Sequence, residues 1–165
     1  MKDFLIVKKV IQVIPERVKV VYMNDKYMYN YSCSVKRYSR TSPHYVTVEA
    51  ALKYEWNNNV TMNIVSYEFH HNEYRRTFVE LHYKYCDLLN FDKHIGAHVA
   101  AIGFTCPLVA DKRYFMNFTL PMYDLPSVFP FEHARFDVEF TVTATSESIV
   151  KVSFYAHLKR ILNKH

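Results

Sequence analysis

The nine histidines of this chain raise the hypothesis of a metal site, and two of them have a helical spacing. His94 and His98 are four positions apart, so on a helix both imidazoles would lie on one face. Zinc needs a third and usually a fourth protein ligand, and the intervening glutamate of a metalloprotease helix is absent from this pair. His70 and His71 fall in an expected turn. We therefore predict surface histidines and no metal site.

A nucleophile in an activating setting is also missing from the sequence. Glycine occurs only at Gly96 and Gly103, which excludes a nucleophile elbow, a phosphate-binding loop and a dinucleotide-binding fingerprint. Cys106 precedes Pro107, and no neighbouring base or helix start activates its thiol. The sequence thus predicts that the protein is not an enzyme, that it has no catalytic residues and that it uses no cofactor.

The positive charge of the chain raises the alternative of a basic nucleic-acid-binding module. The formal net charge is +5 and the sequence pI is about 9.0. Aromatic and basic residues alternate from residue 26 to residue 31, as they do in some surfaces that stack on bases. No ribonucleoprotein motif accompanies them, so we expect half-buried tyrosines, solvated charges and no nucleic-acid partner. The basic residues form small groups: Lys36, Arg37 and Arg40; Arg75 and Arg76; Lys159 and Arg160.

The clearest structural pattern is an alternation of apolar and polar residues near the C-terminus. Apolar side chains occupy every second position from Phe136 to Val142 and, after a polar turn at 143–148, from Val150 to Phe154 and at Leu158. Successive side chains of a strand point to opposite faces, so these residues share one face of a hairpin and require a second layer to cover them. That face carries no charge and no nucleophile, which favours a core or a ligand cavity over catalysis.

The same period of two predicts a mainly β fold, a two-sheet antiparallel β-sandwich with one short helix between the fifth and sixth strands. A change of apolar parity between Ile64 and Val65 predicts a β-bulge. Apolar residues at three- and four-residue spacing over 87–103 predict the helix, which Gly96 interrupts. We interpret residues 1–165 as a single domain and assign no structure to most of the first 20 or so residues. Strands are expected near 16–22 and 31–39, and over 45–56, 60–69, 77–85, 113–120, 136–142 and 150–158.

Two further residue types bear on the compartment of the protein. Asn-x-Ser/Thr sequons occur at Asn30, Asn59 and Asn117, in positions where a glycan would avoid the core. The three cysteines allow one internal disulfide at most and leave one thiol over. In a cytosolic chain all three would be reduced thiols, so the sequence leaves both states open.

Several motifs resemble those of an insect family of small secreted proteins of unknown function, which includes the chemosensory CheA and CheB proteins. The motifs are residues 31–37, 76–80, Cys86-Asp87-Leu88-Leu89, 104–108 with Cys106-Pro107, 114–120, Leu125-Pro126 and Pro130. The family is similar in fold to the MD-2-related lipid-recognition superfamily and its ganglioside-activator members. The resemblance covers about 130 residues, and its most specific part is the Cys-Asp and Cys-Pro pair.

The resemblance implies a cup of two sheets, secretion, a disulfide between Cys86 and Cys106, and an apolar ligand between the sheets. It also implies a signal peptide, which we do not find at residues 1–9, so we expect an incomplete start of the chain. A membrane receptor is a further partner that chemosensation would require, and the oligomeric state is left open.

We therefore predict a non-enzymatic protein that binds or carries a lipid or another small hydrophobic ligand, with a role in insect chemosensation. The alternative from the same fold is an extracellular protein-interaction domain without a cavity. The residues expected to line the cavity are Trp56, Tyr114, Phe118, Phe136, Phe140 and Phe154.

Overall fold

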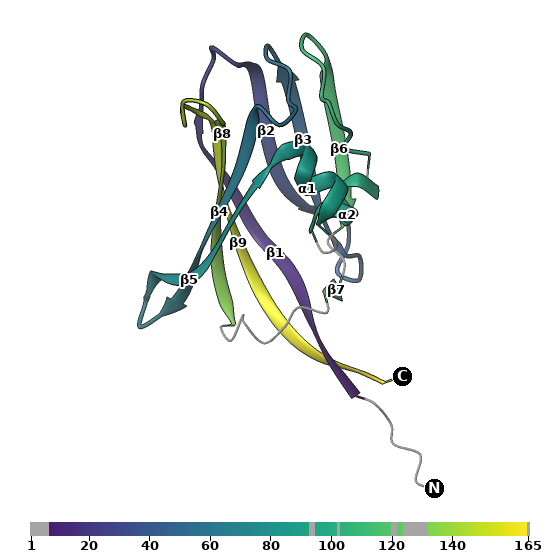
Figure 1. Cartoon of the computed structure of the whole chain (residues 1–165). Coiled ribbons are helices and arrows are strands. Elements are labelled where there is room, and N and C mark those ends of the chain that lie inside the picture. Colours follow the sequence, from purple (N-terminus) through teal and green to yellow (C-terminus); the bar gives the residue numbers. More distant parts are fainter. Residues whose placement is uncertain (1–6, 93–94, 102, 120–121, 124–131, 165) are drawn as a thin grey trace, which may run out of the picture.

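Nine strands form two antiparallel sheets in the computed structural model, which describes residues 7–92, 95–101, 103–119, 122–123 and 132–164 (Figure 1). The larger sheet has the order β5 (Glu73–Lys84), β4 (Val60–His70), β8 (His133–Val142), β9 (Ser148–Lys164), β1 (Val7–Met23) and β7 (Met122–Tyr123). The smaller sheet has the order β2 (Met28–Arg37), β3 (His44–Leu52) and β6 (Arg113–Thr119). The mainly β, two-sheet antiparallel class predicted from the sequence is confirmed.

The β8–β9 hairpin has the predicted register and the predicted buried face. Phe136 pairs with Phe154, and Phe140 pairs with Val150. The valines of β9 are fully buried, Val152 being 1% exposed, whereas the three phenylalanines are half-buried against the same clusters. The alternation of side chains along these strands therefore directs the apolar residues between the sheets, as expected.

The main hydrophobic core joins the two sheets at one end of the molecule. It combines Met28 and Leu52 of the smaller sheet with Val60, Val142 and Val150 of the larger one. Burial of such side chains contributes roughly 1.5–3 kcal/mol each, so this end carries much of the stability. A second, smaller cluster of Ile11, Ala134 and Leu158 lies further along the larger sheet.

Most strands begin or end a few residues away from their predicted bounds, and β1 and β3 show the reasons most clearly. β1 begins at Val7 and pairs with β9 over almost its whole length, although the sequence favoured a strand only near 16–22. Pro15 explains the discrepancy, because it lies beside a register shift, where a strand tolerates proline. β3 ends at Leu52, and Trp56 follows it in an isolated bridge to Leu108.

The bulge predicted in β4 is wrong, because β4 pairs with β8 without interruption and the irregularity of the β4–β5 ladder lies in β5, where residues 77–79 stand opposite Ser66. Ser66 shares the inner face of β4 with Val60 and Met62, and it is completely buried there. The Ser66 hydroxyl donates to the carbonyl oxygen of Val79 at 2.9 Å, so the buried polar group is satisfied.

Two short helices replace the single helix that the sequence predicted between β5 and β6. α1 spans Tyr85–Phe91 and α2 spans Ile95–Ala101. Asp92 adopts an extended conformation at the end of α1, and its carboxylate accepts the Gly96 N–H at 2.8 Å. A Cβ at Gly96 would overlap the Leu88 carbonyl group, so glycine permits the two helices to meet. Neither of these helices is long and apolar enough to cross a membrane, as judged from the part of the chain described.

A disulfide ties α1 to the segment that precedes β6. It joins Cys86 and Cys106, whose Cα atoms are 5.4 Å apart, and Cys33 remains a free cysteine. The Asn58 side-chain oxygen accepts the Cys86 N–H at 3.0 Å, which fixes the start of α1 against the turn before β4.

Replacing Phe140 with glutamate should prevent folding or lower the free energy of unfolding by several kcal/mol, because it places a charge on a buried strand face. Phe78→Glu is the matched control, since Phe78 on β5 is 78% exposed and its replacement should change stability by no more than about 0.5 kcal/mol. Soluble yield and urea denaturation measure both effects. A soluble Phe140→Glu protein with wild-type cooperativity would contradict the assignment of the inner face.

Replacing Cys86 with serine should lower the melting temperature under oxidising conditions and leave it unchanged with reductant present. The disulfide closes a loop with a sequence separation of 20 residues, which corresponds to about 3 kcal/mol in the loop-entropy model. Cys106→Ser should cause the same loss, and the double variant should lose no more than either single one. An equal effect of Cys86→Ser with and without reductant would argue against a stabilising disulfide.

Candidate functional site

The inner face of the smaller sheet is the side to which the fully buried Val46 points. The residues that share this side form the face. Cys33 pairs with Val48, and Val48 in turn pairs with Met116, so these three side chains share that face. Tyr31 and Ala50 lie one pair further along it. The face therefore combines aliphatic, aromatic and thiol groups opposite the apolar side of β8 and β9.

Trp56 and Phe140, two of the predicted cavity residues, contact each other at the closed end of the sandwich. Their ring centroids are 4.7 Å apart, and Tyr85 packs edge-on against Trp56 at 5.8 Å. Trp56 is only 5% exposed, so it belongs to the core there. Its indole Nε1–H is buried and has no hydrogen-bond acceptor among the described residues.

The other four predicted residues are distributed over both sheets. Phe136 and Phe154 form a cross-strand pair on the larger sheet, where Phe154 packs against the main core and Phe136 against the smaller cluster. Tyr114 and Phe118 lie on the inner face of β6, and both are half-buried. The structure thus brings all six residues to inner faces or to the core between them, while only Trp56 is fully enclosed.

Tyr31 and Cys33 on β2 occupy the interior without being sealed from solvent. Burial raises the pKa of the Cys33 thiol to about 12, and it raises the pKa of Tyr31 well above its usual range. Both side chains nevertheless keep an intermediate exposure to solvent. β2 is an edge strand of the smaller sheet, so these inward-facing side chains remain partly accessible there. The sequence analysis did not assign either residue to the interior, although Tyr31 and Cys33 occupy every second position before Val35, which indicates a shared inner face.

A groove of about 570 Å³ lies where the β2–β3 turn faces β1. Gln12, Val13, Ile14 and Pro15 of β1 form one wall, and residues 41–44 with Arg37 form the other. The volume is within the range of small-molecule sites. The sequence offered no signal for this groove, because it depends on how a turn of one sheet stands against a strand of the other.

The opposite end of the interior is closed by the turn between β1 and β2. The Asn24 N–H donates to the Ile149 carbonyl oxygen at 2.8 Å, and Tyr27 and Lys26 both donate to the Glu147 carboxylate. These hydrogen bonds lower the pKa of Glu147. The molecule is therefore closed at this end and grooved near the β2–β3 turn.

The residues considered for nucleic-acid binding do not form one platform. Tyr27 and Met28 are buried in the core and Tyr31 faces the interior, so of the four large side chains at 27, 28, 29 and 31 only Tyr29 is exposed. Several basic side chains also have acidic partners: Arg75 bonds Glu73 at 2.6 Å, and Arg76 bonds Glu80 at 2.8 Å. These aromatic residues are thus divided between core, interior and surface, and the two arginines are paired surface charges.

The predicted histidine pair on the helix lies outside what the structure describes. His94 is not among the described residues, and His98 belongs to α2 without a described side chain. The asparagines of all three sequons are among the described residues. Asn30 and Asn117 are exposed on β2 and β6, and Asn59 is half-buried in the turn before β4.

Cys33 should react at least 100-fold more slowly with iodoacetamide in the native protein at pH 8 than in the urea-unfolded protein. Only the thiolate is nucleophilic, and a pKa of about 12 leaves far less thiolate at pH 8 than the ordinary value does. Mass spectrometry of the alkylated protein measures the rate. A native rate equal to the unfolded rate would place Cys33 outside the interior.

Comparison with known proteins gives structural neighbours without a sequence relative. No protein-family model matches the chain, and no curated protein matches it. Chicken MD-1 complexed with lipid IVa is similar with a TM-score of 0.43 and 10% identity, over 94% of this chain and 99% of that one. A Niemann-Pick type C2 protein from the Japanese carpenter ant is similar with a TM-score of 0.36 and 11% identity, over 87% of this chain and 89% of that one.

Proposed function

We propose that the protein binds a lipid or another small hydrophobic ligand between its two sheets, without catalysing a reaction on it. The observation that carries the proposal is that inward-facing side chains of both sheets, Tyr31 and Cys33 on β2 and Phe136 and Phe154 on the larger sheet, are only partly buried. Half-buried Tyr114, Phe140 and Phe154 add aromatic walls of the kind that ligand cavities use. A ligand between the sheets would cover the surface that these inward-facing side chains leave exposed.

The groove beside the β2–β3 turn is the proposed entrance for the ligand. Arg37 lines it, and its guanidinium group donates to the carbonyl oxygens of Ser42 and Arg40. A cation at the mouth of an apolar space favours an amphiphile with an anionic head and an apolar tail, such as a fatty acid. The cavity lining that we propose is Trp56, Tyr114, Phe118, Phe136, Phe140 and Phe154, together with Tyr31 and Cys33.

Secretion and glycosylation belong to the same proposal. The Cys86–Cys106 disulfide supports an oxidising compartment, because disulfides persist outside the cytosol. Asn30 and Asn117 have exposed side chains suited to carry glycans. Asn59 suits a glycan less, since its amide donates to the Glu55 carbonyl oxygen at 3.2 Å. The motif resemblance extends the proposal to ligand carriage in insect chemosensation, with a membrane receptor as partner.

A protein-interaction domain with a filled core is the competing function. It is favoured by the exposed phenyl rings of Phe78 and Phe91, which are 78% and 76% exposed. The two functions differ in whether the interior near Cys33 has room for a further group, so a substitution at that position separates them.

Replacing Cys33 with phenylalanine should fill the proposed cavity, abolish uptake of a fluorescent fatty acid, and leave the free energy of unfolding within about 1 kcal/mol of wild type. In a filled core the same change would overpack and cost about 1–3 kcal/mol. Ser34→Phe is the matched control, because the neighbouring Ser34 is exposed on the outer face and its replacement should alter neither property.

Fluorescence titration and urea denaturation of the three proteins decide between the functions. Fatty-acid uptake by wild type that Cys33→Phe loses and Ser34→Phe keeps supports the cavity. Absence of uptake by wild type, combined with a destabilised Cys33→Phe protein, would overturn it.

A further inference from the structure

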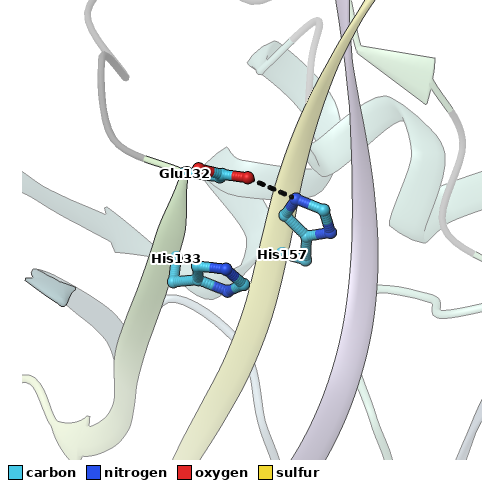
Figure 2. A group of neighbouring side chains, drawn as sticks. All are labelled: Glu132, His133 and His157. Atoms are coloured by element: carbon cyan, nitrogen blue, oxygen red, sulfur yellow. Dashed lines mark ion pairs between the residues drawn. The ribbon is translucent and has the colours of Figure 1, made fainter.

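We propose that Glu132, His133 and His157 form a binding site for a divalent transition-metal ion, best fitted by zinc, on the outer face of the larger sheet. Among the described residues this is the one group in which at least three metal-binding side chains converge, and their ligand atoms all lie within 4.8 Å of one another. Figure 2 shows the three side chains gathered where β8 begins beside β9.

The strand register brings the two imidazoles together. His133 of β8 pairs directly with His157 of β9, and side chains at directly opposed positions of an antiparallel pair are close neighbours. The rings stack with their centroids 4.8 Å apart at an interplanar angle of 18°. Since sheet hydrogen bonds hold both backbones, little conformational entropy is lost when the two rings bind one ion.

The distance between the Glu132 carboxylate and the His157 ring already matches the distance between two ligands of one metal ion. Its Oε1 lies 3.4 Å from His157 Nε2, as the dashed line in Figure 2 marks. Two ligands of a tetrahedral zinc ion, each about 2.0–2.1 Å from the metal, are about 3.3–3.4 Å apart. The ligand atom of His133 lies within 4.8 Å of the other two, so a small rearrangement would complete a three-ligand set of the His₂Glu type.

Glu16 of β1 orients His133 from the other side. Its Oε1 lies 3.1 Å from His133 Nδ1, so an Nδ1–H bonded to this carboxylate leaves Nε2 with the lone pair that a metal requires. Glu16 is therefore a positioning residue, and it adds a second negative charge to offset the metal ion. Arg135, on the same face of β8, is paired with Asp137 at 3.1 Å, which reduces its repulsion of a bound cation.

The site is separate from the proposed ligand cavity. The odd-numbered side chains of β8 and β9 face away from the interior, opposite the buried Ala134, Ala156 and Leu158. The ion would join the starting residues of β8 to β9 directly and to β1 through Glu16. Metal binding can therefore be measured without knowledge of the hydrophobic ligand.

Isothermal titration of the tag-free, disulfide-bonded protein with zinc chloride tests the proposal. Wild type should bind one zinc ion per chain, and His133→Asn/His157→Asn should lower the association constant at least tenfold. Glu16→Gln should lower it about 10- to 100-fold, as the loss of an outer-shell partner does, while the melting temperature without zinc stays unchanged. Zinc should raise the melting temperature of wild type and leave that of the double variant unaffected.

The matched control is His70→Asn/His71→Asn in the turn between β4 and β5. These two rings are also adjacent, with centroids 3.9 Å apart, but no third metal-binding side chain joins them among the described residues. This control should keep wild-type zinc affinity. Unchanged affinity in His133→Asn/His157→Asn, or wild type without a stoichiometric site, would overturn the proposal.

Discussion

The pairing of β9 with β8 on one side and β1 on the other is the interaction on which the rest of the structure depends. Val152 of β9 lies opposite Val138 and Val20, so a single strand sets the register of both neighbours. A slip by one residue would turn the fully buried Val150 and Val152 to solvent. At roughly 1.5–3 kcal/mol per side chain, that loss would be a large share of a small domain's stability.

The unequal lengths of the strands explain why the interior is closed at one end and accessible elsewhere. β1 and β9 have 17 residues each, whereas β2 has 10 and β6 has 7. In Figure 1 the ends of β1 and β9 extend beyond the smaller sheet. Aromatic rings fill the short overlap near Trp56 and Phe140, and the described strands of the smaller sheet are too short to cover the remaining inner face in the same way.

Patterns within one strand could be predicted from the sequence, whereas relations between distant strands could not. The alternation around Phe140 and the turn after Val142 predicted the hairpin and its buried face, and the apolar spacing after residue 87 predicted helix. The first half of β1 was missed because Pro15 interrupts its pattern, and the break between α1 and α2 depends on the Asp92 contact with Gly96. The groove depends on how a turn of one sheet faces a strand of the other, and the Glu132 cluster depends on pairing between strands. The register that sets Phe140 opposite Val150 also sets His133 opposite His157, a signal that the sequence analysis left unused.

Trp56 is the sole tryptophan of the chain, and it lies in contact with Phe140 on the interior side of the sandwich. Its fluorescence emission consequently reports on one place in the molecule. No engineered label is needed, and no other indole contributes to the signal. Since its N–H has no acceptor among the described side chains and carbonyl groups, any oxygen-bearing molecule that came within reach would change both its hydrogen bonding and its spectrum. The chain thus carries an intrinsic optical sensor at the inner end of the space between its sheets.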